Sequence, residues 1–129
     1  MKCRCLNVAH TSVPMQVCDY LEDVMNEGGL VIDHHTCDFF PERWFDLVVV
    51  LQTDNTLLYD RLHKRGYSTK KIQENVECEI MHVVAEEANE CYNSEIVQML
   101  PSNDLDEVEG NVDRIVEWAR LYCASHTAS

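Results

Sequence analysis

An unbroken apolar run, the stretch "DLVVVLQT" from Asp46 to Thr53, constrains the fold of this chain most strongly. The run is too short for a typical helix, and its β-branched valines follow one another without polar interruption. This pattern is typical of a strand that is buried on both faces, as in a parallel sheet. Two shorter runs, Leu30–Ile32 and Glu95–Leu100, are further strand candidates. The stretch "CRCLNVA" near the start is also compatible with a strand.

Apolar residues at helical spacing fill the segments around these runs. They predict helices over Gln16–Glu27, from an N-cap at Asp54 to Gly66, from Thr69 to about Asn93 as one long helix, and over Asp106–Tyr122. Buried strands that alternate with helices imply an α/β domain, in which helices flank a parallel sheet on each side. A length of 129 residues, without repeats or linkers, is one domain's worth of chain.

The charge and the cysteines narrow the class of protein. A formal net charge of −13 repels nucleic-acid phosphates, so we expect no direct nucleic-acid binding. The acidic surface suits a basic partner, or serves only solubility. No apolar stretch is long enough to span a membrane, and we recognise no signal peptide. The seven cysteines are odd in number and lack zinc spacing, so we interpret residues such as Cys78 and Cys123 as reduced core residues of an intracellular protein.

Polar residues follow the Leu30–Ile32 strand at once, in the order Asp33, His34, His35. Ligands of parallel α/β sheets bind outside the carboxyl ends of the strands. A carboxylate in this place can hold Mg²⁺, directly or through water, and His35 can orient a water or a phosphate oxygen. The alternative is that Asp33 caps a turn and that the histidines are solvated.

Five of the ten basic residues lie in the eleven-residue stretch "RLHKRGYSTKK". Arg61 and Arg65 are four residues apart and therefore share one helix face, where their guanidinium groups suit phosphoryl oxygens. The alternative is a solvated helix end, where cations also favour the helix dipole. The aromatic residues Phe39, Phe40, Trp44 and Phe45 are predicted to pack in the core, with stacking on a base as the alternative.

Three segments are long enough to compare with known families: "EGGLVIDHHTCDFFPERWF", "RLHKRGYSTKKIQENVECEI" and "EIVQMLPSN". Together they resemble the adenylate kinase isoenzyme 6 family, small nuclear adenylate kinases and ATPases that also assist maturation of the small ribosomal subunit. The likeness covers about Gln16 to Trp118. It implies a P-loop NTPase fold of the nucleoside monophosphate kinase type and Mg²⁺-dependent phosphoryl transfer from ATP to AMP.

The resemblance also implies roles for single residues. Asp33 and His35 match the Asp-x-His of the family's Walker B region, where the acid helps to hold the magnesium-bound nucleotide and the histidine supports water positioning. Arg65 matches a nucleotide-contacting arginine, with Arg61 as its helper. The lid corresponds to about residues 64–74. Where the family can show a lysine near the nucleotide, after the last strand, this chain has Asp104.

The chain departs from the family pattern at its front. It contains no GxxxxGKT loop, the motif whose backbone amides cradle phosphates and whose lysine reaches the β- and γ-phosphates. We therefore expect a single, N-terminally incomplete adenylate kinase-like domain over residues 1–129, without the first strand, the Walker A loop and the first helix. Because losing one transition-state donor can cost about 10²–10³ in rate, we expect impaired catalysis.

Two functions remain as hypotheses. The first is an adenylate kinase and ATPase that acts on ATP and AMP with Mg²⁺. The second is a non-catalytic module that binds a basic small-subunit ribosomal protein. A third, bland outcome is that the chain does not fold stably alone. The resemblance implies a nuclear location, with the cytoplasm as a further location.

Overall fold

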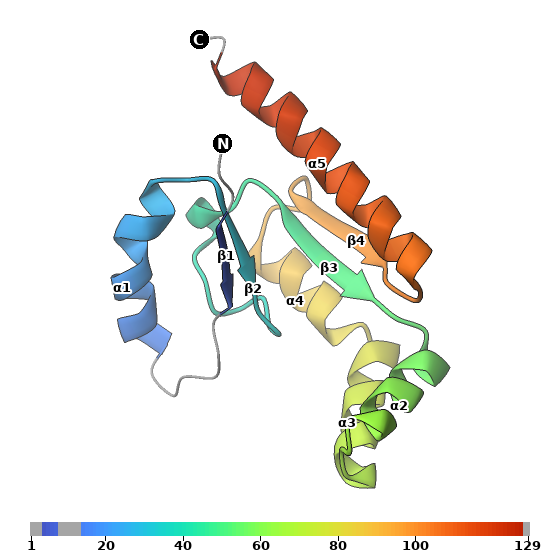
Figure 1. The fold of residues 1–129 in the computed structure, drawn as a ribbon. Helices are drawn as coiled ribbons and strands as arrows, with labels where there is room; N and C mark the ends of the chain where they lie inside the picture. The colour runs from blue at the N-terminus through green and yellow to red at the C-terminus, as the bar shows by residue number, and fades with distance from the viewer. Residues whose placement is uncertain (1–3, 8–13, 128–129) are drawn as a thin grey trace. The chain divides into compact units, whose positions relative to one another are not determined.

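The computed structural model describes residues 4–7 and 14–127, and the chain divides into two compact units (Figure 1). Unit 1 comprises the described residues up to Val48 together with His82–Gln98. Unit 2 comprises Val49–Met81 and the described residues from Met99 onward. The division falls within the first residues of two strands.

Unit 1 contains a parallel pair of strands, β1 (Arg4–Asn7) and β2 (Leu30–Asp33). Their register pairs Arg4 with Leu30 and Asn7 with Asp33. Helix α1 (Pro14–Asn26) joins them and ends before Gly28 and Gly29, whose φ angles of +70° and +68° lie in the left-handed region that glycine tolerates. The predicted strand and helix are thus confirmed, with ends shifted by a few residues.

The aromatic residues that follow β2 form much of the core of unit 1. Phe40 is buried, and its ring lies 4.7 Å from that of Phe39, 5.8 Å from Trp44 and 6.1 Å from Phe45. The short 3₁₀ helix Glu42–Trp44 turns the chain among these rings. Helix α4 (Val83–Cys91) completes the core with Ala85, Ala88 and the following residue, Tyr92. The prediction of core packing is confirmed for Phe40, while the other three rings are half-buried.

The strands β3 (Val48–Gln52) and β4 (Val97–Pro101), most of whose residues belong to unit 2, are neighbours in a second two-stranded sheet. The backbone N–H of Val48 donates to the carbonyl oxygen of Ile96, and the N–H of Ser102 donates to that of Gln52. The partner numbers rise together along both strands, so the pair is parallel. The described strands therefore form two parallel pairs flanked by helices, in agreement with the predicted α/β class.

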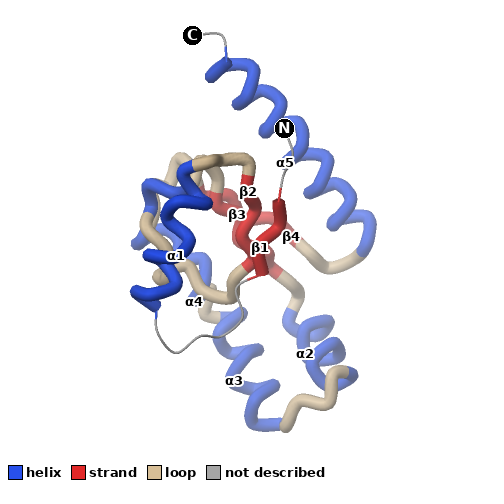
Figure 2. Tube along the Cα trace, turned by 60° about the vertical axis from the view of Figure 1, so that its left-hand side comes forward, coloured by secondary structure: helices blue, strands red, loops and turns tan. Residues whose placement is uncertain are grey.

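A helical hairpin follows β3. Helix α2 (Asn55–Lys64) begins where the Asp54 carboxylate accepts hydrogen bonds from the N–H groups of Thr56 and Leu57, as the sequence predicts for an N-cap. Helix α3 (Thr69–Ile80) begins in the same way at Ser68. The two helices lie side by side in both views (Figures 1 and 2), and they bury Leu62 and Ile72. Helix α5 (Leu105–Thr127) follows β4.

Three predictions about this architecture are wrong. The single helix over residues 69–93 is two helices, because His82 adopts a left-handed conformation (φ 53°, ψ 36°) that ends α3 and starts α4. The strands are not buried on both faces, since Val31 is 50% and Leu51 58% exposed. Cys78 is exposed rather than in the core, because it lies two residues beyond half-buried Val76, on another side of α3. Cys123 is half-buried.

Candidate functional site

The turn after β2 holds the first pair of predicted site residues. His34 anchors this turn: its ring stacks on Phe39 at 5.0 Å, meets Phe40 edge-on at 5.2 Å, and accepts a 3.2 Å hydrogen bond at Nδ1 from the Thr36 N–H. Asp33 and His35 flank it and are both exposed. The alternative that both histidines are solvated is therefore wrong for His34, whose ring packs on two phenylalanines. These phenylalanines, which follow closely in the sequence, are the signal that could have predicted this packing.

Asp33 can contribute one oxygen to a divalent cation. Mg²⁺ is usually bound through one or two carboxylates together with waters and substrate phosphates. A single exposed aspartate at a strand end can supply one of these carboxylates. Among the described residues there is no group of three or more His, Cys, Asp or Glu side chains that could hold a metal ion alone. A magnesium ion would therefore depend on waters and on the phosphates of a nucleotide for most of its ligands.

The second pair, Arg61 and Arg65, lies at the end of α2 in unit 2. Arg61 donates a 3.0 Å hydrogen bond from Nη1 to the carbonyl oxygen of Ser102, and a second bond from Nη2 to that of Asn103. Arg65 is the C-cap of α2, with its backbone N–H on the Arg61 carbonyl, and its side chain is exposed. The guanidinium of Arg61 is thus hydrogen-bonded to the loop that follows β4.

The structure keeps each predicted pair together. Asp33 and His35 share the turn after β2 in unit 1, and Arg61 and Arg65 share the last turn of α2 in unit 2. The predicted lid, residues 64–74, covers the end of α2, the connecting loop and the first half of α3. In this segment the Lys71 ammonium lies 4.5 Å from the centre of the Tyr67 ring, a cation–π contact.

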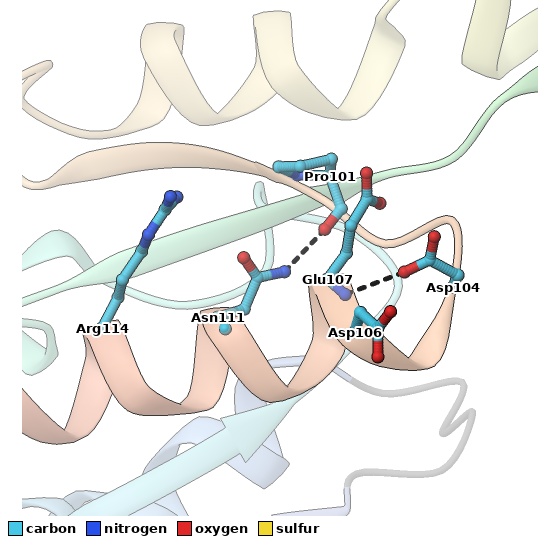
Figure 3. Close-up of a pocket in the computed structure, with 7 residues that line it drawn as sticks. Pro101, Asp104, Asp106, Glu107, Asn111 and Arg114 are labelled. Atoms are coloured by element: carbon cyan, nitrogen blue, oxygen red, sulfur yellow. Dashed lines mark hydrogen bonds between the residues drawn. The ribbon is translucent and has the colours of Figure 1, made fainter.

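A hollow of about 300 Å³ lies at the start of α5 in unit 2 (Figure 3). Asp104 caps the helix by accepting a 2.8 Å hydrogen bond from the Glu107 N–H, and Glu107 accepts one of 2.7 Å from the Asn103 N–H. Asn111, 5% exposed, donates a 2.6 Å bond to the Pro101 carbonyl. Sequence reasoning missed this pair of capping bonds, although Asp104 and Glu107 have the spacing of a capping box. At the position where the family can show a lysine near the nucleotide, Asp104 therefore caps the N-terminus of α5.

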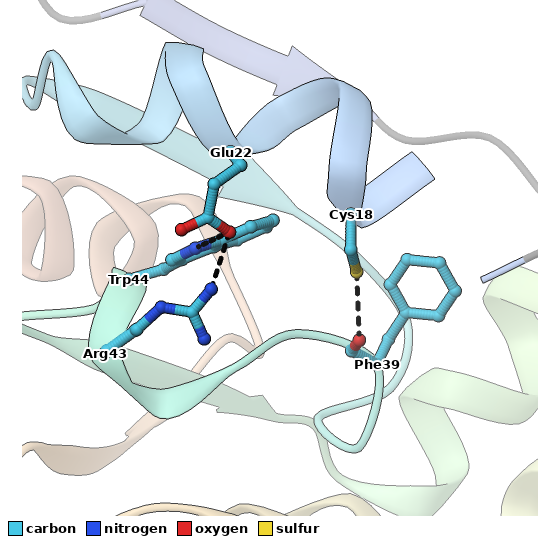
Figure 4. A network of polar contacts seen from close by, with 5 residues as sticks. All are labelled: Cys18, Glu22, Phe39, Arg43 and Trp44. Carbon is cyan, nitrogen blue, oxygen red and sulfur yellow. Dashed lines mark hydrogen bonds and ion pairs between the residues drawn. The ribbon is translucent and has the colours of Figure 1, made fainter. Parts of the chain in front are cut away.

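A polar network in unit 1 joins α1 to the aromatic turn (Figure 4). The Glu22 carboxylate accepts a 2.6 Å hydrogen bond from Arg43 and a 3.1 Å bond from the indole N–H of Trp44. The Arg43 bond, aided by the Trp44 bond, lowers the pKa of Glu22. One turn earlier on α1, the Cys18 thiol lies 3.6 Å from the Phe39 carbonyl, and burial raises the pKa of that thiol. The network fixes α1 beside the loop that follows the Asp33–His35 turn.

None of the described helices is both long enough and apolar enough to cross a bilayer.

The parallel strands and the helices that flank them define the class of this protein as an α/β domain, which the family match that follows identifies as P-loop NTPase-like. Residues 6–82 match the family described as AAA domain. The chain is 54% identical to an adenylate kinase isoenzyme 6 homolog of Dictyostelium discoideum, over 80% of this chain and 59% of that protein. It is 50% identical to the homolog of Caenorhabditis elegans and 46% identical to the homolog FAP7 of Saccharomyces cerevisiae, over 84% of this chain and 61% and 55% of those proteins. The chain belongs to the adenylate kinase isoenzyme 6 family.

The chain spans about six-tenths of the length of these curated relatives. The family and its nucleotide-kinase-like domain are thereby established, and the resemblance found in the sequence is confirmed.

Proposed function

We propose that this chain functions as a nucleoside monophosphate kinase of the adenylate kinase isoenzyme 6 type, which converts ATP and AMP into two ADP and hydrolyses ATP as a second activity. The observation that carries this proposal is the placement of Asp33 and His35. Both side chains are exposed at the carboxyl end of β2, where ligands of parallel sheets bind, on a turn that His34 anchors.

The reaction requires positioning and charge stabilisation more than covalent chemistry. A phosphate oxygen of AMP attacks the γ-phosphorus of ATP, the bond to the β–γ bridging oxygen breaks, and two ADP are formed. When bound with ATP, Mg²⁺ would supply charge neutralisation at the phosphates. In our proposal Asp33 would hold this ion through water, and His35 would orient the water that attacks in the ATPase reaction. In our proposal Arg65, whose side chain is exposed, donates to phosphate oxygens. Arg61, whose guanidinium is bonded to the Ser102 and Asn103 carbonyls, acts as its helper by holding the end of α2 in place.

The absence of GxxxxGKT from the sequence limits the expected rate. Amides and a lysine that cradle phosphates act mainly through electrostatic preorganisation, and removing one donor of this kind costs about 10²–10³ in rate. We therefore propose that the chain alone is catalytically impaired. By family resemblance, we further propose a role in maturation of the small ribosomal subunit, in the nucleus and also in the cytoplasm.

The test measures Mg²⁺-ATP binding by calorimetry and ADP formation from ATP and AMP, with folding checked by circular dichroism. We expect binding that weakens when Mg²⁺ is withdrawn and in the Asp33→Asn variant. The matched control is Asp38→Asn, an exposed aspartate five residues along the same segment, which should bind as the wild type does. His35→Ala should lower residual ATP hydrolysis more than it lowers binding. A folded chain that does not bind Mg²⁺-ATP would exclude the kinase function for this polypeptide.

A second candidate function, a non-catalytic module for a basic small-subunit ribosomal protein, is favoured by the surface of α5. Four apolar side chains at helical spacing are exposed on this helix: Leu105, Val108, Val112 and Val116. Acidic residues border this stripe, namely Glu109, Asp113 and Glu117. An apolar stripe with an acidic border suits a basic, amphipathic segment of a partner.

This second function has its own test, a titration with a purified basic small-subunit ribosomal protein. We expect binding that weakens with salt and in Val112→Arg, which places a cation in the stripe. The matched control is Leu57→Arg, which makes the same kind of change on exposed α2. Equal affinities for the two variants would remove the α5 stripe from the interaction.

A further inference from the structure

Two cysteines of unit 1 lie on segments that the fold holds against each other. Cys37 is part-buried in the loop after β2, two residues beyond His35. Cys91 is exposed at the last position of α4. They are fifty-four positions apart in the sequence, so only the tertiary structure brings their segments together.

The backbone of Cys37 is bound at both its polar groups by residues on either side of Cys91. Its N–H donates a 3.5 Å hydrogen bond to the Glu87 carboxylate, and its carbonyl oxygen accepts a bond from the Tyr92 hydroxyl. Glu87 and Cys91 are four residues apart and therefore lie on the same face of α4. Tyr92, buried and also bonded to the Phe40 carbonyl at 3.2 Å, holds this arrangement in place.

We propose that Cys37 and Cys91 are a redox-active dithiol, which an oxidising small-molecule disulfide such as oxidised glutathione converts into an intramolecular disulfide. Exposed Cys91 reacts first: its sulfur attacks one glutathione sulfur, forms a mixed disulfide and releases one reduced glutathione. The Cys37 sulfur then attacks the Cys91 sulfur, loses its proton to solvent and releases the second glutathione. Two protein thiols are oxidised and one glutathione disulfide is reduced.

The environment of Cys37 determines the rate of the second step. Burial, followed by the negative charge of Glu87, is the main cause that raises the pKa of the Cys37 thiol to about 11. The thiolate is the attacking species, so closure is slow at neutral pH and accelerates as the pH rises. Between pH 7 and pH 9 the thiolate fraction of such a group rises about 100-fold.

The closed form would tie the loop that follows Asp33 and His35 covalently to α4. Because Cys37 lies two residues after His35, oxidation restrains the segment that carries the candidate site. The pairing itself does not depend on the proposed kinase function, and its test requires no nucleotide.

The test incubates the full chain with oxidised glutathione at pH 7 and at pH 9, quenches the reaction with acid, and maps the peptides by mass spectrometry without reduction. At pH 7 we expect glutathione on Cys91 early in the reaction, and at pH 9 we expect this adduct to convert about 100-fold faster into a Cys37–Cys91 disulfide. Cys37→Ser should leave the glutathione adduct on Cys91 at both pH values. Cys91→Ser should leave Cys37 largely unmodified.

The matched control is Cys78→Ser, which removes another exposed thiol and should leave the Cys37–Cys91 pairing unchanged. The same reaction in urea, where the fold is lost, should pair cysteines without selectivity. A glutathione adduct on Cys91 that persists at pH 9 in the folded chain would refute the proposal. So would pairing of Cys91 with Cys78 or Cys123 at a rate equal to its pairing with Cys37.

Discussion

The guanidinium of Arg61 donates a 3.0 Å hydrogen bond to the carbonyl oxygen of Ser102, forty-one residues away in the sequence. A second bond reaches the carbonyl of Asn103, and the amide side chain of Asn103 in turn accepts a 2.7 Å bond from the Asp54 N–H. Arg61 therefore links α2 to the loop that precedes α5. Its forked shape suits the two carbonyls, because the planar guanidinium fixes the directions of its donors, whereas a lysine ammonium is a compact charge on a flexible stem.

Replacing Arg61 should loosen this loop. We expect Arg61→Ala to lower the free energy of unfolding by about 1 kcal/mol, with Arg61→Lys in between, because the lost bonds involve a charged but exposed donor. Hydrogen exchange at the Ser102 and Asn103 amides should become faster. Lys64→Ala, an equal loss of charge on the same helix, is the control. Unchanged exchange in Arg61→Ala would show that other contacts hold the loop.

The two isoleucines of α3 should differ sharply in their contribution to stability. Ile72 is 1% exposed, whereas Ile80 is 52% exposed. We expect Ile72→Ala to cost about 2–5 kcal/mol, the usual range for a buried aliphatic side chain whose removal leaves a cavity. Ile80→Ala should cost less than about 1 kcal/mol. Urea unfolding followed by circular dichroism measures both values, and similar costs would contradict the packing of α2 against α3.

Stability of unit 1 should fall at alkaline pH. Burial raises the pKa of Cys37 from 9.0 to about 11 and that of Tyr92 from 10.0 to about 12, so the fold favours the neutral forms of both groups. Their contribution is fully present below pH 9 and is lost as the pH rises through these folded-state values. Urea unfolding between pH 8 and pH 12 should show this loss.

Two tyrosine variants separate the contributions to this alkaline loss. Tyr92→Phe should flatten the dependence above pH 10, although it also removes the bonds to the Cys37 and Phe40 carbonyls. Tyr59→Phe changes an exposed tyrosine of α2 and serves as the control. Identical pH profiles for wild type and Tyr92→Phe would exclude Tyr92 as the titrating group.

The Glu22 network should titrate in acid. Its lowered pKa means that the carboxylate contributes stability above its ordinary value of 4.5, and this contribution is lost as the pH falls through the lower folded-state value. Protonation removes the charge that Arg43 and Trp44 bind, so Trp44 fluorescence should change below pH 4.5 in a Trp118→Phe background. Glu22→Gln should abolish this transition, and Glu27→Gln should preserve it. A transition that survives in Glu22→Gln would arise from another carboxyl group.

The sequence by itself determined the elements whose signals are local. Continuous apolar runs and helical spacing identified β2, β3, β4, α1 and α2 to within a few residues, and Asp54 was recognisable as an N-cap. Helix α5 was also identified, although it continues five residues beyond the predicted end at Tyr122. Long, specific segments such as the one from Glu27 to Phe45 were sufficient for the family. These signals are readable because backbone preferences and side-chain periodicity depend on neighbouring residues.

The tertiary structure alone decided the features that join distant residues. No glycine or proline marks the break at His82, and no local pattern places the Ser102 carbonyl against Arg61 or Glu87 and Tyr92 around Cys37. The exposure of Val31 and Leu51, which the apolar runs did not predict, is likewise a result of which strands pair. These outcomes depend on how whole elements pack, and residues forty or more positions apart meet only after that packing exists.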